Sequence, residues 1–318
     1  MKIVALDGYT SNPGDISWNA MAAQGDFVCY DRTAKDEIDP RIGDADAVLT
    51  NKVPISRATM EKAPNLKYIG VLATGYNIID LDAARDKGIV VTNIPGYSTV
   101  SVAQFVFALL LEACRRVGHH SRVVREGKWT RCKDFVFWDY PLIELDGKTL
   151  GIVGYGAIGL AVARIAAAFG MKVLANNRNP EKVTESETVK RATLEEVYAG
   201  SDMVSFHVPL FDSTKGMINS SSIAAMKDGV IIVNTARGAL AVEGDVAKAL
   251  ESGKVYVYAA DVATVEPINA DSPLLTAKNC ILTPHIAWAP KEARLRLLDI
   301  AAGNLRAFAA GKPVNAVG

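Results

Sequence analysis

The sequence has few cysteines, no excess of either charge and no long hydrophobic run, and each of these absences excludes a class of protein. The 35 basic and 35 acidic residues cancel, which removes any electrostatic case for nucleic acid or an anionic membrane as a partner. No apolar segment approaches the roughly 20 residues of a membrane span. The cysteines lack the close spacing of disulfide scaffolds and zinc sites; they are Cys29, Cys114, Cys132 and Cys280.

These absences favour a cytoplasmic protein with reduced thiols. The chain begins with residues 1–7, which have the pattern of a strand rather than of a cleavable signal. A metal cluster of Cys114, His119 and His120 is conceivable, but these residues lie in a basic helical stretch without a second ligand group. We therefore predict no metal site.

Short apolar strands alternate with helical segments throughout the chain, a pattern typical of parallel sheets. A length of 318 residues indicates two domains. The first sheet is predicted to use segments 2–6, 27–30, 47–50, 68–73 and 89–93. The second begins with the strand before Gly154 and continues through segments 173–176, 203–207, 230–234, 257–261 and 280–283. We expect an α/β protein with two doubly wound domains.

The two domains are predicted to be interleaved in the sequence. Ser98 and Thr99 can cap a long helix that continues through Leu110. Pro290 opens a last amphipathic helix, which cannot form a domain alone and should return to cover the first sheet. We expect a flavodoxin-like substrate domain at 1–100 plus 290–318 and a Rossmann dinucleotide-binding domain at 101–289.

The most informative segment is a glycine motif between a strand and a helix. Gly154 permits a tight turn, Gly156 lets the backbone approach a pyrophosphate, and Gly159 allows close packing of the helix on the strand. Ile152 and Val153 supply the strand, so the motif has the context that a dinucleotide site requires. Ala157 and Ile158 at the helix start contribute N–H groups that face the phosphate charge.

The end of the next strand bears on the choice of dinucleotide. NAD enzymes usually carry an acidic residue there, about 20 residues beyond the glycines. This sequence has Asn177 followed by Arg178, so no carboxylate repels a 2'-phosphate and one guanidinium can bind it. NADP(H) is favoured and NAD(H) is possible, since Arg178 can also be a solvated charge beside amides that bind the ribose.

Three polar residues follow three separate predicted strands of the second domain. They are Arg237, Glu266 and His285. Carboxyl ends of parallel strands face the ligand crevice, so the three side chains should converge on the cofactor. Arg237 can hold a carboxylate and polarise the adjacent oxo group, His285 can donate a proton to the forming alkoxide, and Glu266 can orient the imidazole. Singly, each could be an ordinary surface or core residue; together they suit carbonyl reduction.

These motifs resemble those of the D-isomer-specific 2-hydroxyacid dehydrogenases. The segments that carry the resemblance are 154–159, 234–238, 261–267 and 283–288, and it extends over nearly the whole chain. Segments 73–77 and 97–104 are most similar to the branch of glycerate dehydrogenases and hydroxypyruvate or glyoxylate reductases. Two departures are Asn177, where NAD users of the family have Asp, and Phe105, where many members have His.

The resemblance implies roles for further residues. It makes Arg237, Glu266 and His285 catalytic, and places Asp261 at the carboxamide side of the nicotinamide. His207, Val208 and Pro209 would line the adenine side, and Thr235 and Ala236 would contact the cofactor. The backbone N–H groups of Thr74 and Gly75 would bind the substrate carboxylate, together with Arg237 and His285.

The implied activity is reversible NAD(P)H-dependent reduction of a small 2-oxo acid to the D-2-hydroxy acid by a homodimer. The aromatic run 135–140 is a candidate dimer arm or ordinary core packing, and its Trp138 could cap the substrate pocket or pack in the interface. Two alternatives stay open: a dehydrogenase for a bulkier or different 2-oxo acid, and a dinucleotide-sensing protein of the corepressor type.

Overall fold

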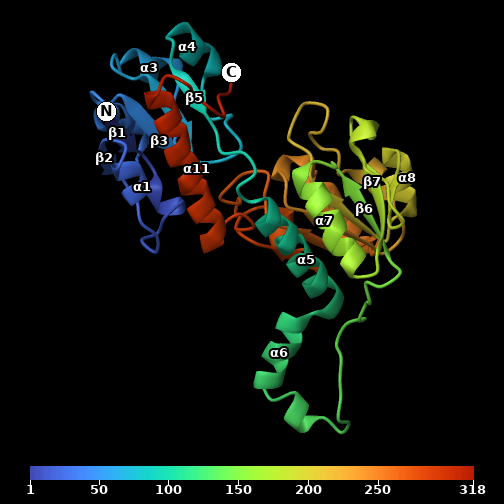
Figure 1. Cartoon of the computed structure of the whole chain (residues 1–318). Helices are drawn as coiled ribbons and strands as arrows, with labels where there is room; N and C mark the ends of the chain where they lie inside the picture. Colours follow the sequence, from blue (N-terminus) through green and yellow to red (C-terminus); the bar gives the residue numbers. More distant parts are fainter. The chain divides into compact units, whose positions relative to one another are not determined.

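The computed structural model describes all residues, 1–318, and divides into two compact units, Met1–Ser98 with Trp288–Gly318 and Thr99–Ala287. Each unit has one sheet in which every strand pair is parallel (Figure 1). This confirms the expected fold class, two doubly wound α/β domains. No helix has the length and apolar character needed to cross a membrane.

The first unit contains a five-stranded sheet in the order β2-β1-β3-β4-β5. The strands are β1 (Lys2–Ala5), β2 (Asp26–Cys29), β3 (Ala47–Thr50), β4 (Tyr68–Val71) and β5 (Val90–Thr92). Its helices are α1 (Asn19–Ala22), α2 (Ile38–Ile42), α3 (Arg57–Glu61), α4 (Leu81–Asp86) and α11 (Lys291–Ala309), with short 3₁₀ turns at Gly8–Thr10 and Lys35–Glu37.

Both faces of this sheet are covered by helices. Buried residues of α2, α3 and α4 form one core layer, and those of α1 and α11 form the other. Leu297 and Leu305 of α11 are fully buried against Ile3 and Leu49 of the sheet. The last helix thus returns to the first sheet, as its apolar stripe requires.

The second unit contains a seven-stranded sheet in the order β12-β11-β10-β9-β6-β7-β8. The strands are β6 (Thr149–Val153), β7 (Lys172–Asn176), β8 (Val189–Arg191), β9 (Met203–Phe206), β10 (Val230–Asn234), β11 (Val255–Ala260) and β12 (Cys280–Leu282). The helices are α5 (Thr99–Arg115), α6 (Val117–Arg125), α7 (Ala157–Ala168), α8 (Leu194–Gly200), α9 (Ser220–Ala224) and α10 (Glu243–Ser252). Short 3₁₀ turns are at Trp129–Arg131, Pro180–Lys182, Gly238–Leu240 and Pro273–Leu275.

The prediction of six strands in this sheet was wrong by one, because β8 was missed. β8 is a three-residue edge strand in which only Val189 is buried. Such a strand has neither an apolar run nor an alternating pattern, and its only partner is β7. It is held by pairing rather than by hydrophobic burial.

Two core layers enclose the sheet of the second unit. α5 and α7 pack on one face, where Val106, Leu110 and Val162 lie against Ile152 and Val257. α8, α9 and α10 cover the other face. The chain order reverses between β6 and β9, so the topological switch point lies between their carboxyl ends.

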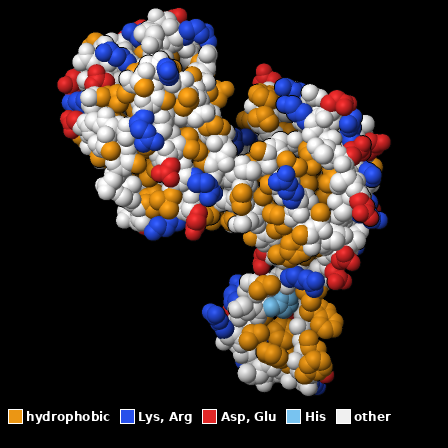
Figure 2. All heavy atoms as spheres, in the orientation of Figure 1, with side chains coloured by type: hydrophobic (Ala, Val, Ile, Leu, Met, Phe, Trp, Pro, Cys, Tyr) orange, Lys and Arg blue, Asp and Glu red, His pale blue; other side chains and the backbone are white.

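Residues 116–145 form an arm whose middle part extends away from the sheet of this unit, while Arg116 and Leu145 at its two ends are buried in the unit (Figure 1). Its exposed apolar side chains include Val117, Trp129, Phe135, Trp138 and Leu142, and Figure 2 shows hydrophobic atoms gathered on the arm. Phe135 is 88% exposed. Core packing, one of the two interpretations of the run 135–140, is therefore wrong for the exposed Phe135, Val136 and Trp138.

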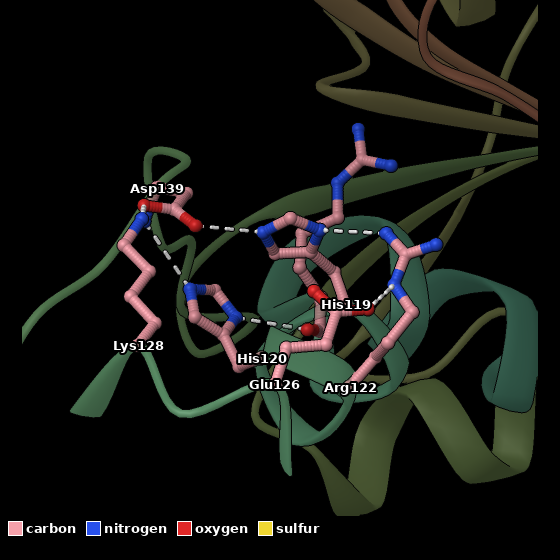
Figure 3. A network of polar contacts seen from close by, with 7 residues as sticks. His119, His120, Arg122, Glu126, Lys128 and Asp139 are labelled. Atoms are coloured by element: carbon pink, nitrogen blue, oxygen red, sulfur yellow. Dashed lines mark hydrogen bonds and ion pairs between the residues drawn. The ribbon is translucent and has the colours of Figure 1, made fainter. Parts of the chain in front are cut away.

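A polar network fixes the arm internally (Figure 3). Asp139 accepts a hydrogen bond from His119 at 2.8 Å and pairs with Lys128. These hydrogen bonds from Lys128 and His119 hold the pKa of the Asp139 carboxyl below its usual range. His120 Nδ1 lies 2.8 Å from the carbonyl oxygen of Arg116. The arm is thus an ordered element rather than a loose loop.

Candidate active site

The glycine motif lies at the topological switch point. Gly154 follows β6 with a φ of +100°, and a Cβ there would lie 2.7 Å from the carbonyl carbon of His207, which follows β9. A Cβ on Gly159 would lie 2.3 Å from the carbonyl oxygen of Gly154. These two positions exclude any side chain, because the turn and the start of α7 are packed against their neighbours.

The remaining glycine of the motif, Gly156, faces open space. No atom lies within 4 Å of the position that a Cβ on Gly156 would take. The N–H groups of Ala157 and Ile158, in the first turn of α7, donate no hydrogen bond within the chain, and that turn contains no acidic residue. Such a helix start can bind an anion with its free N–H groups.

A second observation fits a dinucleotide at this edge. The hydroxyl oxygen of Thr235, in the loop after β10, is buried and has no hydrogen-bond partner in the protein. A buried polar group without a partner is rare, and a bound ligand is one way to supply the missing partner. Ala236, the next residue, is half-buried, and its N–H donates to the Asn234 side chain at 3.1 Å.

His207 follows β9 and precedes a loop in which Val208 is half-buried and Pro209 is exposed. Its Nε2 is 2.9 Å from the hydroxyl of the fully buried Ser205. Burial lowers the pKa of His207 to about 4, because a charged imidazole would lose its hydration there. The ring is therefore neutral at physiological pH.

The polar side chains after β7 differ in whether they already form hydrogen bonds within the chain. Asn176 donates its amide to the carbonyl of Ala192 at 3.1 Å, and Asn179 accepts from the N–H of Glu181 at 3.2 Å. The side chains of Asn177 and Arg178 form no hydrogen bond or ion pair within the chain, and Arg178 is exposed. These two residues are free to contact a ligand at the end of β7.

The three residues expected after β10, β11 and β12 lie in loops at the carboxyl edge of the sheet. Nδ1 of His285 is 2.7 Å from Oε2 of Glu266, and Oε1 of Glu266 accepts from the N–H of Ala263 at 3.2 Å. Arg237 is exposed, and its guanidinium donates only to the neighbouring carbonyl of Ala236, at 2.7 Å. The structure thus pairs His285 with Glu266 and leaves Arg237 without an acidic partner.

The close approach of the Arg237 turn to the Glu266 loop was not expected from the sequence. A Cβ on Gly238 would lie 1.9 Å from the carbonyl carbon of Ala263. Only glycine permits this contact. The spacing of the residues along the chain contained no signal for it, since the contact depends on how the loops after β10 and β11 meet.

Asp261 is fully buried and organises the turn that contains His285. Its Oδ1 accepts from the Thr283 hydroxyl at 2.6 Å and from the N–H of Ile286 at 2.9 Å, and its Oδ2 from the N–H of Ala287 at 2.8 Å. His285 itself has a left-handed φ of +56°. The carboxylate thus holds in place a turn that is costly for a residue with a side chain.

The two residues expected to bind a substrate carboxylate lie in the first unit. Thr74 and Gly75 follow β4, and their backbone N–H groups donate no hydrogen bond within the protein. The Thr74 hydroxyl donates to the carbonyl of Ile94 at 2.8 Å, and its carbonyl accepts from Asn93 at 2.8 Å. These two hydrogen bonds hold the backbone at Thr74, while the N–H groups of Thr74 and Gly75 stay available to a ligand.

A cleft of about 410 Å³ lies beside the Glu266 loop, lined by residues that include Val242, Glu243, Thr264 and Ser272. Arg237, Glu266 and His285 are not among its lining residues. The candidate site therefore consists of the strand-end residues and does not include this cleft.

Comparisons with known proteins agree with this arrangement. Residues 107–287 match the family model described as D-isomer specific 2-hydroxyacid dehydrogenase, NAD binding domain. The chain is 55% identical to a hydroxypyruvate reductase of Blautia hydrogenotrophica, over 100% of this chain and 99% of that protein. It is 39% identical to a glycerate dehydrogenase of Methylorubrum extorquens, over 89% of this chain and 88% of that protein.

The fold is also similar to a solved enzyme with bound cofactor. An acyclic imino acid reductase, Bsp5, in complex with NADPH and D-Arg superimposes with a TM-score of 0.86 at 29% identity, over 100% of both chains. The chain belongs to the D-isomer-specific 2-hydroxyacid dehydrogenase family. Its second unit contains a nicotinamide dinucleotide-binding domain.

The buried neutral His207 predicts a loss of stability in acid. In the unfolded chain this histidine binds a proton near its ordinary pKa of 6.5, whereas the folded protein binds it only near pH 4. Stability is therefore complete above about pH 6.5 and decreases as the pH falls toward 4, by about 3 kcal/mol from this residue. Urea unfolding of His207→Gln should show a correspondingly flatter pH dependence between pH 7 and 4.5; parallel curves for parent and variant would contradict the assignment.

Proposed function

We propose that this protein reduces small 2-oxo acids, hydroxypyruvate or glyoxylate, to the D-2-hydroxy acids, and that the reaction is reversible. The observation that carries this proposal is the pairing of His285 with Glu266 at 2.7 Å, at the same edge of the sheet as Arg237, which has no acidic partner. The names of relatives that cover nearly the whole chain support the choice of substrate.

The chain's own groups account for substrate binding. The Arg237 guanidinium binds the carboxylate and polarises the oxo group, because it presents several N–H donors and has no acidic partner in the protein. Thr74 and Gly75 supply further N–H donors for the carboxylate. We assign substrate binding to segment 1–100 with 290–318 and dinucleotide binding to segment 101–289.

His285 supplies the proton. Its Nδ1 faces the Glu266 carboxylate, which fixes the ring orientation and leaves Nε2 to hold the proton that the substrate oxygen receives. The nicotinamide dinucleotide, when bound, supplies the hydride. Residues that would hold it are Gly154, Gly156, Ala157, Ile158, Gly159, Asn177, Arg178, His207, Val208, Pro209, Thr235, Ala236, Arg237, Asp261 and His285.

The Asp261 carboxylate differs from the other groups in this set because it already forms several hydrogen bonds within the protein. Three hydrogen-bond donors of the protein already occupy its carboxylate. One acceptor position on Oδ2 is still open to a carboxamide N–H. We assign the residue first to holding the His285 turn and second to the cofactor.

Kinetics with hydroxypyruvate, glyoxylate, pyruvate and phenylpyruvate test this function. The parent should have its highest kcat/KM with the first two acids, and His285→Ala should lower kcat by about 10² to 10⁴, the usual contribution of a general acid. Arg237→Ala should also raise the substrate KM. A preference for phenylpyruvate would favour a dehydrogenase for bulkier acids, and dinucleotide binding without turnover of any acid would favour a sensing protein of the corepressor type.

We further propose that NADP(H) is the preferred cofactor. Asn177 is neutral and Arg178 is free, whereas the nearby Glu181 is engaged by Arg191 at 2.7 Å. A 2'-phosphate at the end of β7 would therefore meet one unpaired cation and no unpaired carboxylate from these residues.

The parent should accordingly have at least a tenfold higher kcat/KM with NADPH than with NADH, and Asn177→Asp should reverse the order by repelling the phosphate. Arg178→Ala should weaken NADPH alone, while Lys182→Ala in the same loop serves as the control. A parent that prefers NADH would contradict this proposal.

We also propose that the arm, residues 116–145, joins two copies in a homodimer. Figure 2 shows hydrophobic atoms gathered on the arm, and a monomer would leave its exposed aromatic side chains in water. Trp138 is 63% exposed and is one of these side chains, so it is available to a second copy.

Sedimentation equilibrium should show a dimer for the parent and a monomer for the double variant Phe135→Lys/Trp138→Lys, since burial of two charges would oppose association. Phe211→Lys, at a residue 51% exposed but outside the arm, should leave the dimer intact. A monomeric parent would refute the proposed role of the arm.

A further inference from the structure

The loop between β11 and the 3₁₀ turn at Pro273–Leu275 carries Glu266 and is attached at two points to one side chain of α10. Oε1 of Glu243 accepts from the N–H of Thr264 at 3.1 Å, and Oε2 accepts from the Ser272 hydroxyl at 2.5 Å. Ser272 is buried and Glu243 is half-buried. One carboxylate thus fastens both ends of segment 264–272.

This attachment is adjacent to the pair of Glu266 and His285. The N–H of Ala263 donates to Oε1 of Glu266, and the next N–H along the chain, that of Thr264, donates to Glu243. Two consecutive peptide groups are therefore fixed by two different carboxylates. This backbone leads along the chain to Glu266, whose Oε2 lies 2.7 Å from Nδ1 of His285.

The negative charge of the Glu243 carboxylate suits the fastening of this loop. Partial burial raises its pKa, but hydrogen bonds from Ser272 and Thr264 outweigh that effect and hold the pKa below its usual range. Glu243 is also the first residue of α10, where the helix dipole favours a negative charge. An ionised acceptor forms stronger hydrogen bonds than a neutral one.

A role confined to α10 does not account for these contacts. An acidic residue in a first turn commonly serves its own helix, but both oxygens of Glu243 are directed to the loop after β11. Resting on the function proposed above, we propose that Glu243 is a positioning residue that holds Glu266 against His285 during proton transfer.

The kinetic test uses the full-length protein, in the oligomeric state in which it is purified, with hydroxypyruvate and NADPH. Glu243→Ala should lower kcat about tenfold or more while the KM for hydroxypyruvate and the Kd for NADPH stay within about twofold, because the residue touches neither ligand. Glu243→Gln should retain most of kcat, since its amide oxygen can accept from Thr264 and its NH₂ can donate to Ser272. Glu251→Ala, at an exposed residue of the same helix, is the matched control.

A double-mutant cycle shows whether Glu243 acts through Glu266. In a Glu266→Ala background, Glu243→Ala should cause no further loss of kcat, because the group that it positions is gone. An equal loss in both backgrounds would overturn the proposal, and so would a Glu243→Ala variant with the parent's kcat. If Glu243→Ala does not fold, Ser272→Ala removes one of the two contacts and should show a smaller loss with the same dependence on Glu266.

A readout independent of turnover separates this proposal from the proposed function. The Nδ1–H proton of His285, hydrogen-bonded to a carboxylate, should give a downfield resonance in histidine-labelled protein, assigned by its loss in His285→Ala. Glu243→Ala should broaden or shift that resonance and Glu251→Ala should not. A parent that turns over none of the acids refutes the function alone; an unchanged resonance in Glu243→Ala refutes the positioning role alone.

Discussion

The parallel pairing of β10, β11 and β12 is the constraint on which the candidate site depends. Because these neighbouring strands run in one direction, each of the loops that follow them emerges at the same edge of the sheet. Residues separated by 48 positions, from Arg237 to His285, are thereby delivered to one region without any local sequence relation. An antiparallel partner at any of the three positions would have sent one loop to the opposite edge.

Carboxylates then join the loops that the sheet brings together. Asp261 accepts from three donors in the turn after β12, and Glu243 fastens the loop after β11. The first unit uses the same device, since Asp7, which follows β1, accepts from the N–H groups of Asn51, Lys52 and Val53, which follow β3. A carboxylate suits this role because it offers several acceptor positions to unpaired peptide donors.

Several polar groups assigned to ligand binding lack an acidic or hydrogen-bond partner that would compete with a ligand, whereas the polar groups that hold the structure already have partners. Arg237 and Arg178 are cations without acidic partners, Thr235 has an unpaired buried hydroxyl, and the start of α7 has free N–H groups. In contrast, the side-chain amide of Asn176, the residue next to Asn177, donates to the carbonyl of Ala192, which follows β8. Polarity alone could not separate these residues.

The sequence by itself determined the two parallel sheets, the glycine motif and the strand ends that carry Arg237, Glu266 and His285, because apolar runs and glycine spacing report local conformation and burial. It missed β8, whose single buried residue leaves no periodic pattern. Only the tertiary structure decided that Gly238 touches Ala263, that Glu243 holds Thr264 and Ser272, and that Phe135, Val136 and Trp138 are exposed. These contacts depend on strand order and on where loops meet, and residues distant in the sequence contain no periodic signal of either.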